Sequence, residues 1–374
     1  MRPVAKGIHK SGQPVAQARV MIVKQAQSVF KTPRALRAAA AALLLSLLAG
    51  PARAQENAEA GFQGYLQLLA ARARGAGVSE ATIAAVTGGL TLNPRVISLD
   101  RAQPGGGAAS LIPSFEPYRR KHVDPARISG GRRIVAESAG ALAQLEQRYG
   151  VPAKILLAIW GHESNYGAYT GDFDLARSLA TLAYEGRRRE LFAGEFIALL
   201  KMIDRGVPRS KLVGSWAGAF GNPQFLPSVY LKVAQDADGN GFADIWASKA
   251  DTLASIANYF RDAGWRPGEP WGFAVTTPAG LDRAALGTSL ASPRCPKVYA
   301  RHSRWRTMRE WRALGMAPRS GIWPDDTMMA SLIEPDGPGR TAYLLTGNYR
   351  VILDYNCSNL YALSVGLLAD EIAR

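Results

Sequence analysis

A glutamate near the end of an apolar segment is the residue of this chain whose setting best suits chemistry. Glu163 follows Ile155 by eight residues and Ile159 by four, so in a helix its carboxylate lies on the apolar stripe, near the C-terminal end. Apolar neighbours and the negative end of the helix dipole both disfavour the ionised form, which raises the pKa of a carboxyl group as a general acid requires. Far more often, a glutamate at a helix end is a solvated surface group, so this spacing alone does not identify an enzyme.

Glu163 belongs to the first of five motifs that follow one another along the chain. The motifs are WGHESNYG (160–167), ATLAYEGRR (180–188), GSWAGAFGNPQFLP (214–227), IANYF (256–260) and DYNCSNLYA (354–362). In this order they closely resemble the membrane-bound lytic transglycosylase B family, and the resemblance extends from about Phe62 to the C-terminus.

The resemblance implies a mainly α-helical, lysozyme-like catalytic domain around a glycan cleft. It also implies an enzyme that needs no cofactor and cleaves the β-1,4 bond between N-acetylmuramic acid and N-acetylglucosamine of peptidoglycan. The product carries a 1,6-anhydromuramic acid end, so no water is consumed. Glu163 stands at the glutamate of the family motif W-G-x-E-[ST]-x-[YWF]-G, which is the family's sole catalytic carboxylate.

A single carboxylate departs from ordinary glycoside hydrolysis, which uses two carboxylates about 5 Å apart for retention or roughly 6.5–9.5 Å apart for inversion. One suffices if the 2-acetamido group of the substrate stabilises the cationic centre and the muramyl 6-hydroxyl ends the reaction. Glu163 would then act first as acid and afterwards as base. Asp172 and Asp174 are the nearest candidates for a second carboxylate, and we expect them to serve loop solvation and helix capping instead.

Six polar or aromatic residues match substrate-binding positions of the family. Aromatic rings stack on sugar faces, and amide or hydroxyl groups bind sugar edges. The six are Tyr118, Ser215, Gln224, Tyr259, Tyr355 and Asn356. Taken one at a time, each tyrosine is more often a packing residue. Phe220 and Leu226 stand where the family usually has methionines, which puts the pocket shape in doubt, whereas His162 occupies a variable position and has no second ligand that would indicate a metal site.

An EF-hand-like loop follows at 236–244 (DADGNGFAD). Oxygen ligands stand at positions 1, 3, 5 and 9 of the pattern and glycine at position 6. These ligands are Asp236, Asp238, Asn240 and Asp244. The glutamate required at position 12 is absent, because Ala247 occupies it. The loop therefore predicts either a structural calcium site or a polar turn that leads to Trp246.

Apolar periodicity predicts the elements that position these residues. We expect helices over residues 62–74, 132–149, 152–166, 174–185, 188–204, 252–263 and 359–372, with Ser79 capping a further short helix and Asp251 the helix at 252. Short alternating runs with glycine and proline over 271–349 indicate a small β-containing subregion. With the resemblance, this predicts a helical catalytic domain at 55–270, a β-containing subregion at 271–350 and a segment at 351–374 that returns to the catalytic domain.

Residues 1–54 have the pattern of a signal peptide. A basic segment (31–37) precedes an apolar run (38–48) and a small-x-small site that ends at Ala54. The apolar run is shorter than the roughly 20 residues that span a membrane. We expect cleavage between Ala54 and Gln55, release into the periplasm, and Met21 as an alternative start. No cysteine follows the apolar run, so a lipid anchor is not expected.

The charge of the chain lies largely in this segment. Its nine basic residues account for most of the formal net charge of +15, and +6 remains without them. That mild excess suits either an anionic polymer or an ordinary solvated surface. Nucleic acid is excluded as a partner because an exported protein has no access to it and no basic stripe or binding motif remains.

Cys295 and Cys357, the two cysteines of the chain, meet an oxidising compartment after export, so the sequence predicts either a disulfide between them or two buried thiols. Two other functions stay open beside the transglycosylase: a hydrolytic muramidase, and a catalytically idle peptidoglycan-binding protein. Peptidoglycan glycan strands are the expected partner and a monomer the expected state. The sequence names no partner protein of cell-wall synthesis or division.

Overall fold

The structure is a computed structural model that describes residues 34–103, 114–287, 295 and 298–374. Its contacts divide the chain into two units at Ala60/Gly61. Helix α1 (Arg34–Gly75) passes through this boundary. Among the described residues, no helix is both long and apolar enough to cross a membrane. The basic part of the predicted signal peptide up to residue 33 lies outside the described residues.

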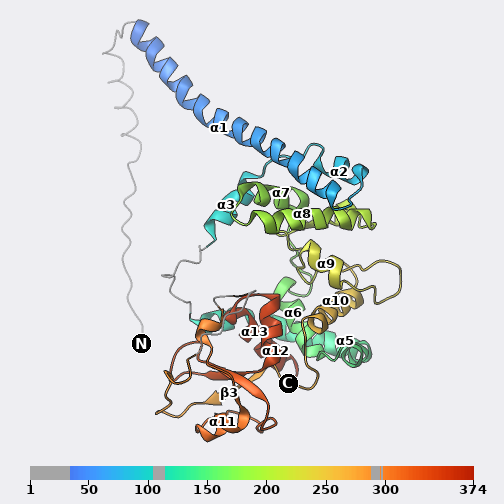
Figure 1. The fold of residues 1–374 in the computed structure, drawn as a ribbon, viewed down its shortest axis with the longest axis vertical. Coiled ribbons are helices and arrows are strands. Elements are labelled where there is room, and N and C mark those ends of the chain that lie inside the picture. The colour runs from blue at the N-terminus through green and yellow to red at the C-terminus, as the bar shows by residue number, and fades with distance from the viewer. Residues whose placement is uncertain (1–33, 104–113, 288–294, 296–297) are drawn as a thin grey trace, which may run out of the picture. The chain divides into compact units, whose positions relative to one another are not determined.

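The unit Gly61–Arg374 is mainly α-helical, as the sequence predicts (Figure 1). After α1, its helices are α2 (Glu80–Thr87), α3 (Pro94–Ala102), α4 (Phe115–His122), α5 (Pro125–Tyr149), α6 (Ala153–Ser164), α7 (Leu175–Glu185), α8 (Arg189–Asp204), α9 (Pro227–Val233), α10 (Lys249–Asp262), α11 (Met308–Ala313), α12 (Gly347–Tyr355) and α13 (Asn359–Ile372). Two 3₁₀ turns lie at Arg209–Lys211 and Val298–Arg301.

Several helices begin at a polar cap whose side chain accepts a backbone N–H of the first turn. Ser79 caps α2 and Asp174 caps α7, as expected. The cap of α10, however, is Ser248, and the expectation that Asp251 caps this helix is wrong. Asp251 lies inside the first turn, fully buried, because its carboxylate accepts N–H groups of the preceding loop.

Helix α5 begins seven residues earlier than predicted, at Pro125. The two glycines at 130 and 131 weaken a helix prediction, but the helix needs them for close packing. A Cβ on Gly130 would lie 2.6 Å from the Tyr166 ring, and one on Gly131 would lie 2.5 Å from Ile372. The helix is kinked at Ser138, where the backbone is non-helical.

Within the described residues, the strands form two antiparallel sheets. The first is a two-stranded pair of β1 (Phe173–Asp174) and β2 (Val213–Gly214). The second has five strands in the order β4-β6-β7-β3-β5: β3 (Gly272–Thr276), β4 (Arg306–Thr307), β5 (Ala317–Pro318), β6 (Met329–Ile333) and β7 (Ala342–Leu345). All strands of the second sheet fall within the predicted β-containing subregion. Strands β3, β6 and β7 share an apolar cluster with α11 that includes Met308, Trp311 and Leu344.

Helix α6 lies at the centre of the helical part of this unit. It packs against α5, α10 and α13, so the last helix of the chain returns to the segment that carries Glu163 (Figure 1). Six consecutive residues of α6, 155–160, are buried. Since one helix face cannot bury six consecutive residues, α6 must be covered on several sides.

Candidate active site

Glu163 lies in the last turn of α6, and its carboxylate contacts the first turn of α13. The Tyr361 hydroxyl donates a hydrogen bond to Glu163 Oε1 at 2.5 Å. Tyr361 is buried, whereas Glu163 is half-buried. A carboxyl group in this setting is surrounded by protein but retains one accessible side.

The surroundings raise the pKa of Glu163 from 4.5 to about 7. Burial is the larger cause, and the hydrogen bond from Tyr361 opposes it by favouring the ionised form. The strong desolvation and the partial exposure are compatible, because desolvation depends on the surrounding protein mass and exposure on one open side. Near neutral pH the group can therefore both donate and accept a proton, which matches the sequence expectation of a raised pKa.

The turn after α6 is held in an unusual backbone conformation. Asn165, Tyr166 and Gly167 all have positive φ, of which the first two are left-handed conformations that favour glycine. Ser164 donates to the Asn222 carbonyl at 2.8 Å and accepts the Gly167 N–H at 3.0 Å. The turn thereby fixes the C-terminal end of α6 against the segment of the third motif.

Tyr166 also ties this turn to α5. Its hydroxyl donates to the Arg127 carbonyl at 2.6 Å, and the Arg127 Nε donates to the Gly161 carbonyl at 3.1 Å. The Tyr166 ring passes so close to α6 that a Cβ on Gly161 would lie 2.7 Å from it. Gly161 of the first motif is therefore a packing requirement two residues before Glu163.

The structure brings four of the six predicted substrate-binding residues together, and three of them come from α10, α12 and the third motif. Tyr355 and Tyr259 pack edge to face, with ring centroids 4.8 Å apart, and the Tyr355 hydroxyl donates to the Pro223 carbonyl at 2.6 Å. Gln224 is the next residue, half-buried and at φ +51°, and its amide donates to the Thr170 and Gly221 carbonyls at 3.2 and 3.0 Å. The charge of Glu163 contributes to raising the pKa of Tyr355, so the two groups are neighbours.

Tyr118 reaches the same site from α4. It is half-buried, and burial followed by the charge of Glu163 raises the pKa of its hydroxyl. Ser215 is half-buried too, but its hydroxyl accepts the Ala219 N–H at 3.0 Å, which closes the turn after β2. Asn356 ends α12 with an exposed side chain. No contact joins these last two residues to Glu163 in the described part of the chain.

Of the two other candidate carboxylates, Asp174 has structural partners. Asp174 accepts the Arg177 N–H at 2.8 Å as the cap of α7 and forms an ion pair with Arg209, while Asp172 is exposed. Capping was the expected role of Asp174. Among the described residues, no carboxylate contributes to the pKa shift of Glu163.

Phe220, which stands where the family usually has a methionine, is fully buried and stacks on Trp246 with centroids 5.4 Å apart. Phe220 therefore belongs to the packing between the third motif and Trp246.

Tyr361 is not among the predicted site residues, although it lies in the fifth motif. A tyrosine two residues into a predicted helix carries no signal that its hydroxyl meets a carboxylate 198 residues earlier. Asp251 is not among the predicted cation ligands either, yet it joins Asp236 and Asp238 in a cluster whose carboxylate oxygens lie within 4.8 Å of one another.

The other two predicted cation ligands, Asp244 and Asn240, are not part of this carboxylate cluster. Asp244 pairs with Lys211 at 3.0 Å and accepts the N–H groups of Trp246 and Ala247. The side chain of Asn240 accepts the Phe242 N–H at 2.9 Å. Asp236 accepts three loop N–H groups, including that of Gly241 at 2.7 Å.

Cys295 and Cys357 form a disulfide with a Cα–Cα distance of 5.4 Å, which decides between the two cysteine predictions. Cys357 lies between α12 and α13. The disulfide therefore fixes the connection between the helices that carry Tyr355 and Tyr361.

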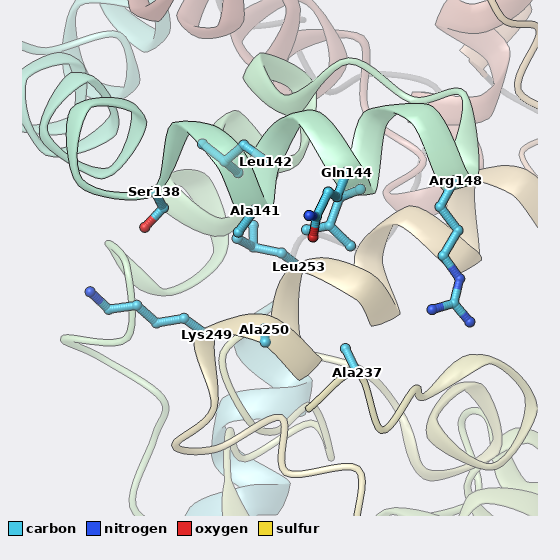
Figure 2. Close-up of a pocket in the computed structure, with 10 residues that line it drawn as sticks. Ser138, Ala141, Leu142, Gln144, Arg148, Ala237, Lys249, Ala250 and Leu253 are labelled. Carbon is cyan, nitrogen blue, oxygen red and sulfur yellow. The ribbon is translucent and has the colours of Figure 1, made fainter. Parts of the chain in front are cut away.

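A groove of about 400 Å³ lies elsewhere, between α5 and α10. Figure 2 shows Ser138, Gln144 and Arg148 along α5, opposite Lys249 on α10. None of the predicted substrate-binding residues lines it.

Comparison with known proteins places this geometry in a family. Residues 61–370 match the transglycosylase SLT domain. The chain is 31% identical over 259 residues to the membrane-bound lytic murein transglycosylase B of Escherichia coli K12, a match that covers 68% of this chain and 66% of that protein. The match thus spans slightly less than two thirds of the length of that relative.

Solved structures agree with the match. SltB3 from Pseudomonas aeruginosa, in complex with NAG-anhNAM-pentapeptide, superposes with a TM-score of 0.74 at 38% identity, covering 83% of this chain and 79% of that one. The Escherichia coli lytic transglycosylase Slt35, in complex with calcium, gives a TM-score of 0.66 at 27% identity over 84% of this chain and 93% of its own. These matches confirm the resemblance seen in the five motifs, and the chain belongs to the transglycosylase SLT domain family.

Proposed function

We propose that this protein is a lytic transglycosylase that cleaves the β-1,4 bond between N-acetylmuramic acid and N-acetylglucosamine and leaves 1,6-anhydromuramic acid ends. The observation that carries the proposal is the setting of Glu163, a half-buried carboxyl group whose pKa of about 7 allows it to act in both protonation states. Asp172 and Asp174 do not pair with it, so a mechanism with a single carboxylate fits the residues present.

In the proposed mechanism, protonated Glu163 donates its proton to the glycosidic oxygen as the bond from the muramyl C1 breaks. The 2-acetamido group stabilises the positive charge that develops at C1. The resulting carboxylate then accepts the proton of the muramyl 6-hydroxyl while O6 forms a bond to C1. Glu163 returns to its starting state, and every atom of the substrate remains in the two products.

Tyr361 contributes to the first step. Its hydroxyl hydrogen bonds to Oε1, so Oε2 is the oxygen left to carry the transferable proton. The same bond stabilises the carboxylate that forms as the proton leaves. Tyr361 therefore makes Glu163 a stronger acid than burial alone would allow.

We assign substrate contacts to Tyr118, Tyr259, Tyr355, Ser215, Gln224 and Asn356. Tyr118, Tyr355 and Gln224 have the best support. The charge of Glu163 contributes to the raised pKa of both tyrosines, so both lie near it. Gln224 has a strained backbone with positive φ, a feature that clusters at functional sites. The Gln224 amide donates to carbonyls through Nε2, which leaves its Oε1 as an acceptor for an acetamido N–H or a sugar hydroxyl.

Analysis of the products tests the proposal. Purified peptidoglycan sacculi are digested with the protein and, in parallel, with Glu163→Gln, and the muropeptides are identified by mass spectrometry. The wild type should release anhydromuramyl ends and the variant should not. Reducing muramic acid ends would indicate a hydrolytic muramidase. Glycan binding without either product would indicate an idle binding protein.

We propose a structural calcium ion as an addition that the reaction does not require. Asp236, Asp238 and Asp251 present carboxylate oxygens, the donors that Ca²⁺ prefers, but the bidentate glutamate of a full EF-hand is missing. A weak site is therefore expected. Isothermal titration with CaCl₂ should detect binding that Asp236→Asn abolishes, and no heat in the wild type at millimolar Ca²⁺ would refute the site.

We also propose export to the periplasm with cleavage before Gln55, a monomeric state, and the domain limits given above. N-terminal sequencing of protein recovered from the periplasm should begin at Gln55. A protein that retains residues 1–54 would contradict cleavage.

A further inference from the structure

A row of aromatic rings in contact connects α4, α6 and α13 next to Glu163. The ring of Tyr118 stacks on His122 with centroids 3.9 Å apart, and His122 stacks on His162 at 5.1 Å with only 3° between the ring planes. His162 in turn meets the Tyr361 ring edge to face at 4.9 Å. The row thus ends on the tyrosine that donates to Glu163.

Hydrogen bonds fix the orientation of His162. Its Nε2 lies 2.7 Å from Ser364 Oγ, and the Ser364 hydroxyl lies 2.8 Å from the Tyr361 carbonyl. A serine has one hydroxyl proton and a carbonyl can only accept, so both contacts are satisfied if Nε2–H donates to Ser364 and Ser364 donates to Tyr361. His162 therefore holds Tyr361 twice, through its ring and through its backbone.

The charges around His162 favour the neutral imidazole. Burial, followed by the charges of His122 on α4 and Arg127 on α5, lowers the pKa of His162 to about 3, while Asp124 at the start of α5 opposes them. Arg127 and Asp124 form an ion pair with each other. Burial also lowers the pKa of His122, assisted by Arg127 and Lys121 and opposed by Asp124 and by the hydrogen bond to the Tyr118 carbonyl.

Neutrality matters because of the adjacent residue. An imidazolium next to Glu163 would favour the carboxylate and weaken the protonated form that the first step needs. A neutral ring supplies contact and a hydrogen bond without that electrostatic effect.

We propose that His162 is a positioning residue: as a neutral imidazole held between His122 and Ser364, it keeps the Tyr361 hydroxyl on Glu163. This inference rests on the proposed function, because it assigns His162 a role in the acid chemistry of Glu163. It makes His162 act through Tyr361, without contact to the substrate.

Kinetics of anhydromuropeptide release over pH 4.5–9 test the proposal with His162→Phe, His162→Ala, Tyr361→Phe and the double variant His162→Ala/Tyr361→Phe. A hydrogen bond to a charged group corresponds to roughly a ten- to hundredfold effect, so kcat of Tyr361→Phe and His162→Ala should fall by that factor. KM should stay unchanged. The alkaline limb of the pH profile should move upward in both, because Glu163 loses the bond that favours ionisation.

The double variant gives the decisive comparison. If His162 acts through Tyr361, its kcat should equal that of Tyr361→Phe to within about twofold, the usual scatter of such comparisons. Multiplied losses would overturn the proposal, as would a His162 variant that changes KM but leaves the alkaline limb in place. Met308→Ala, in the apolar cluster of the five-stranded sheet, is the control for loss of stability and should leave the pH profile unchanged.

A spectroscopic measurement is independent of activity and of folding defects in the variants. The chain has four histidines, so ¹⁵N chemical shifts of the imidazoles can be assigned in the wild-type protein. His162 should show the neutral tautomer protonated at Nε2 from pH 5 to 8. A His162 that titrates in this range, or that is protonated at Nδ1 instead, would overturn the proposal. Loss of activity in Glu163→Gln tests the proposed function separately, since a Glu163→Gln that retains activity would refute the acid itself.

Discussion

Replacing Glu163 by glutamine should remove activity and, at alkaline pH, make the protein more stable. Glutamine has nearly the same shape as glutamic acid but neither donates nor accepts the catalytic proton. General acid–base assistance amounts to about 10²–10⁴ in rate. In the proposed mechanism one group serves both steps, so the loss should exceed that of a single step. The stability change follows from the raised pKa, because the folded protein disfavours the carboxylate.

The size of the gain can be worked from the pKa. A carboxyl group that titrates at 4.5 in the unfolded chain and at about 7 in the folded protein destabilises the fold by about 3 kcal/mol when fully ionised. The stabilising protonated form is fully present below pH 4.5, and its contribution is lost as pH rises through 7. Because Glu163 is half-buried and the amide has its own desolvation cost, we expect a gain of about 1–3 kcal/mol at pH 8.

Urea unfolding of the wild type and Glu163→Gln at pH 4.5 and pH 8 measures this difference. The variant should be more stable at pH 8 and close to the wild type at pH 4.5, and both proteins should unfold with the same slope. Glu195→Gln is a control. Glu195 is buried and accepts hydrogen bonds from Ser228, so the protein should lose stability when glutamine replaces it. A Glu163→Gln variant that is less stable than the wild type at pH 8 would refute the reasoning.

Three further changes test other parts of the structure. Tyr361→Phe should raise the Glu163 pKa by about one unit, seen as an upward move of the alkaline limb of the rate profile; an unmoved limb would show that the hydroxyl does not act on the acid. Reducing the disulfide should lower the free energy of unfolding by about 4 kcal/mol, since the bond joins residues separated by 62 positions; unchanged urea midpoints with and without reductant would contradict this. Gly161→Ala should destabilise by about 1–3 kcal/mol, because its Cβ meets the Tyr166 ring, whereas Gly194→Ala in α8, which has open space, should be neutral or stabilising in the same denaturation assay.

The sequence predicts the long amphipathic helices well. The last helix has the predicted limits, Asn359–Ile372, because a serine cap and a long apolar pattern both mark it. Helices α3 and α4 were not predicted, because each is short and few of its residues are buried. The strands β1 and β2 have two residues each, too few for any alternation to appear in the sequence.

The candidate catalytic residue, Glu163, could be singled out from the sequence because its signal is local. Glu163 lies in an apolar helix, and both the apolar stripe from Ile155 and the motif at 160–167 are within eight residues of it. The residues that tune it could not, since Tyr361 and Ser364 reach α6 through tertiary packing that no spacing in the sequence indicates. Asp251 was assigned to a helix cap for the same reason: its true partners are N–H groups of the loop before it.

Glu163 and Tyr361 are 198 residues apart in the sequence, so the pKa of Glu163 depends on the tertiary fold. Burial raises the pKa of Glu163, and α13, which packs on α6 and carries Tyr361, is one of the helices around it. Helix α13 follows the disulfide at Cys357 and also packs on α5. The unfavourable burial of a carboxyl group must therefore be offset by apolar contacts of α6 and α13 that have no part in the chemistry. Substitutions between α6 and α13 should weaken the docking of α13 and lower the pKa of Glu163 towards 4.5 before they unfold the protein. The acid strength of Glu163 therefore depends on the packing of these two helices.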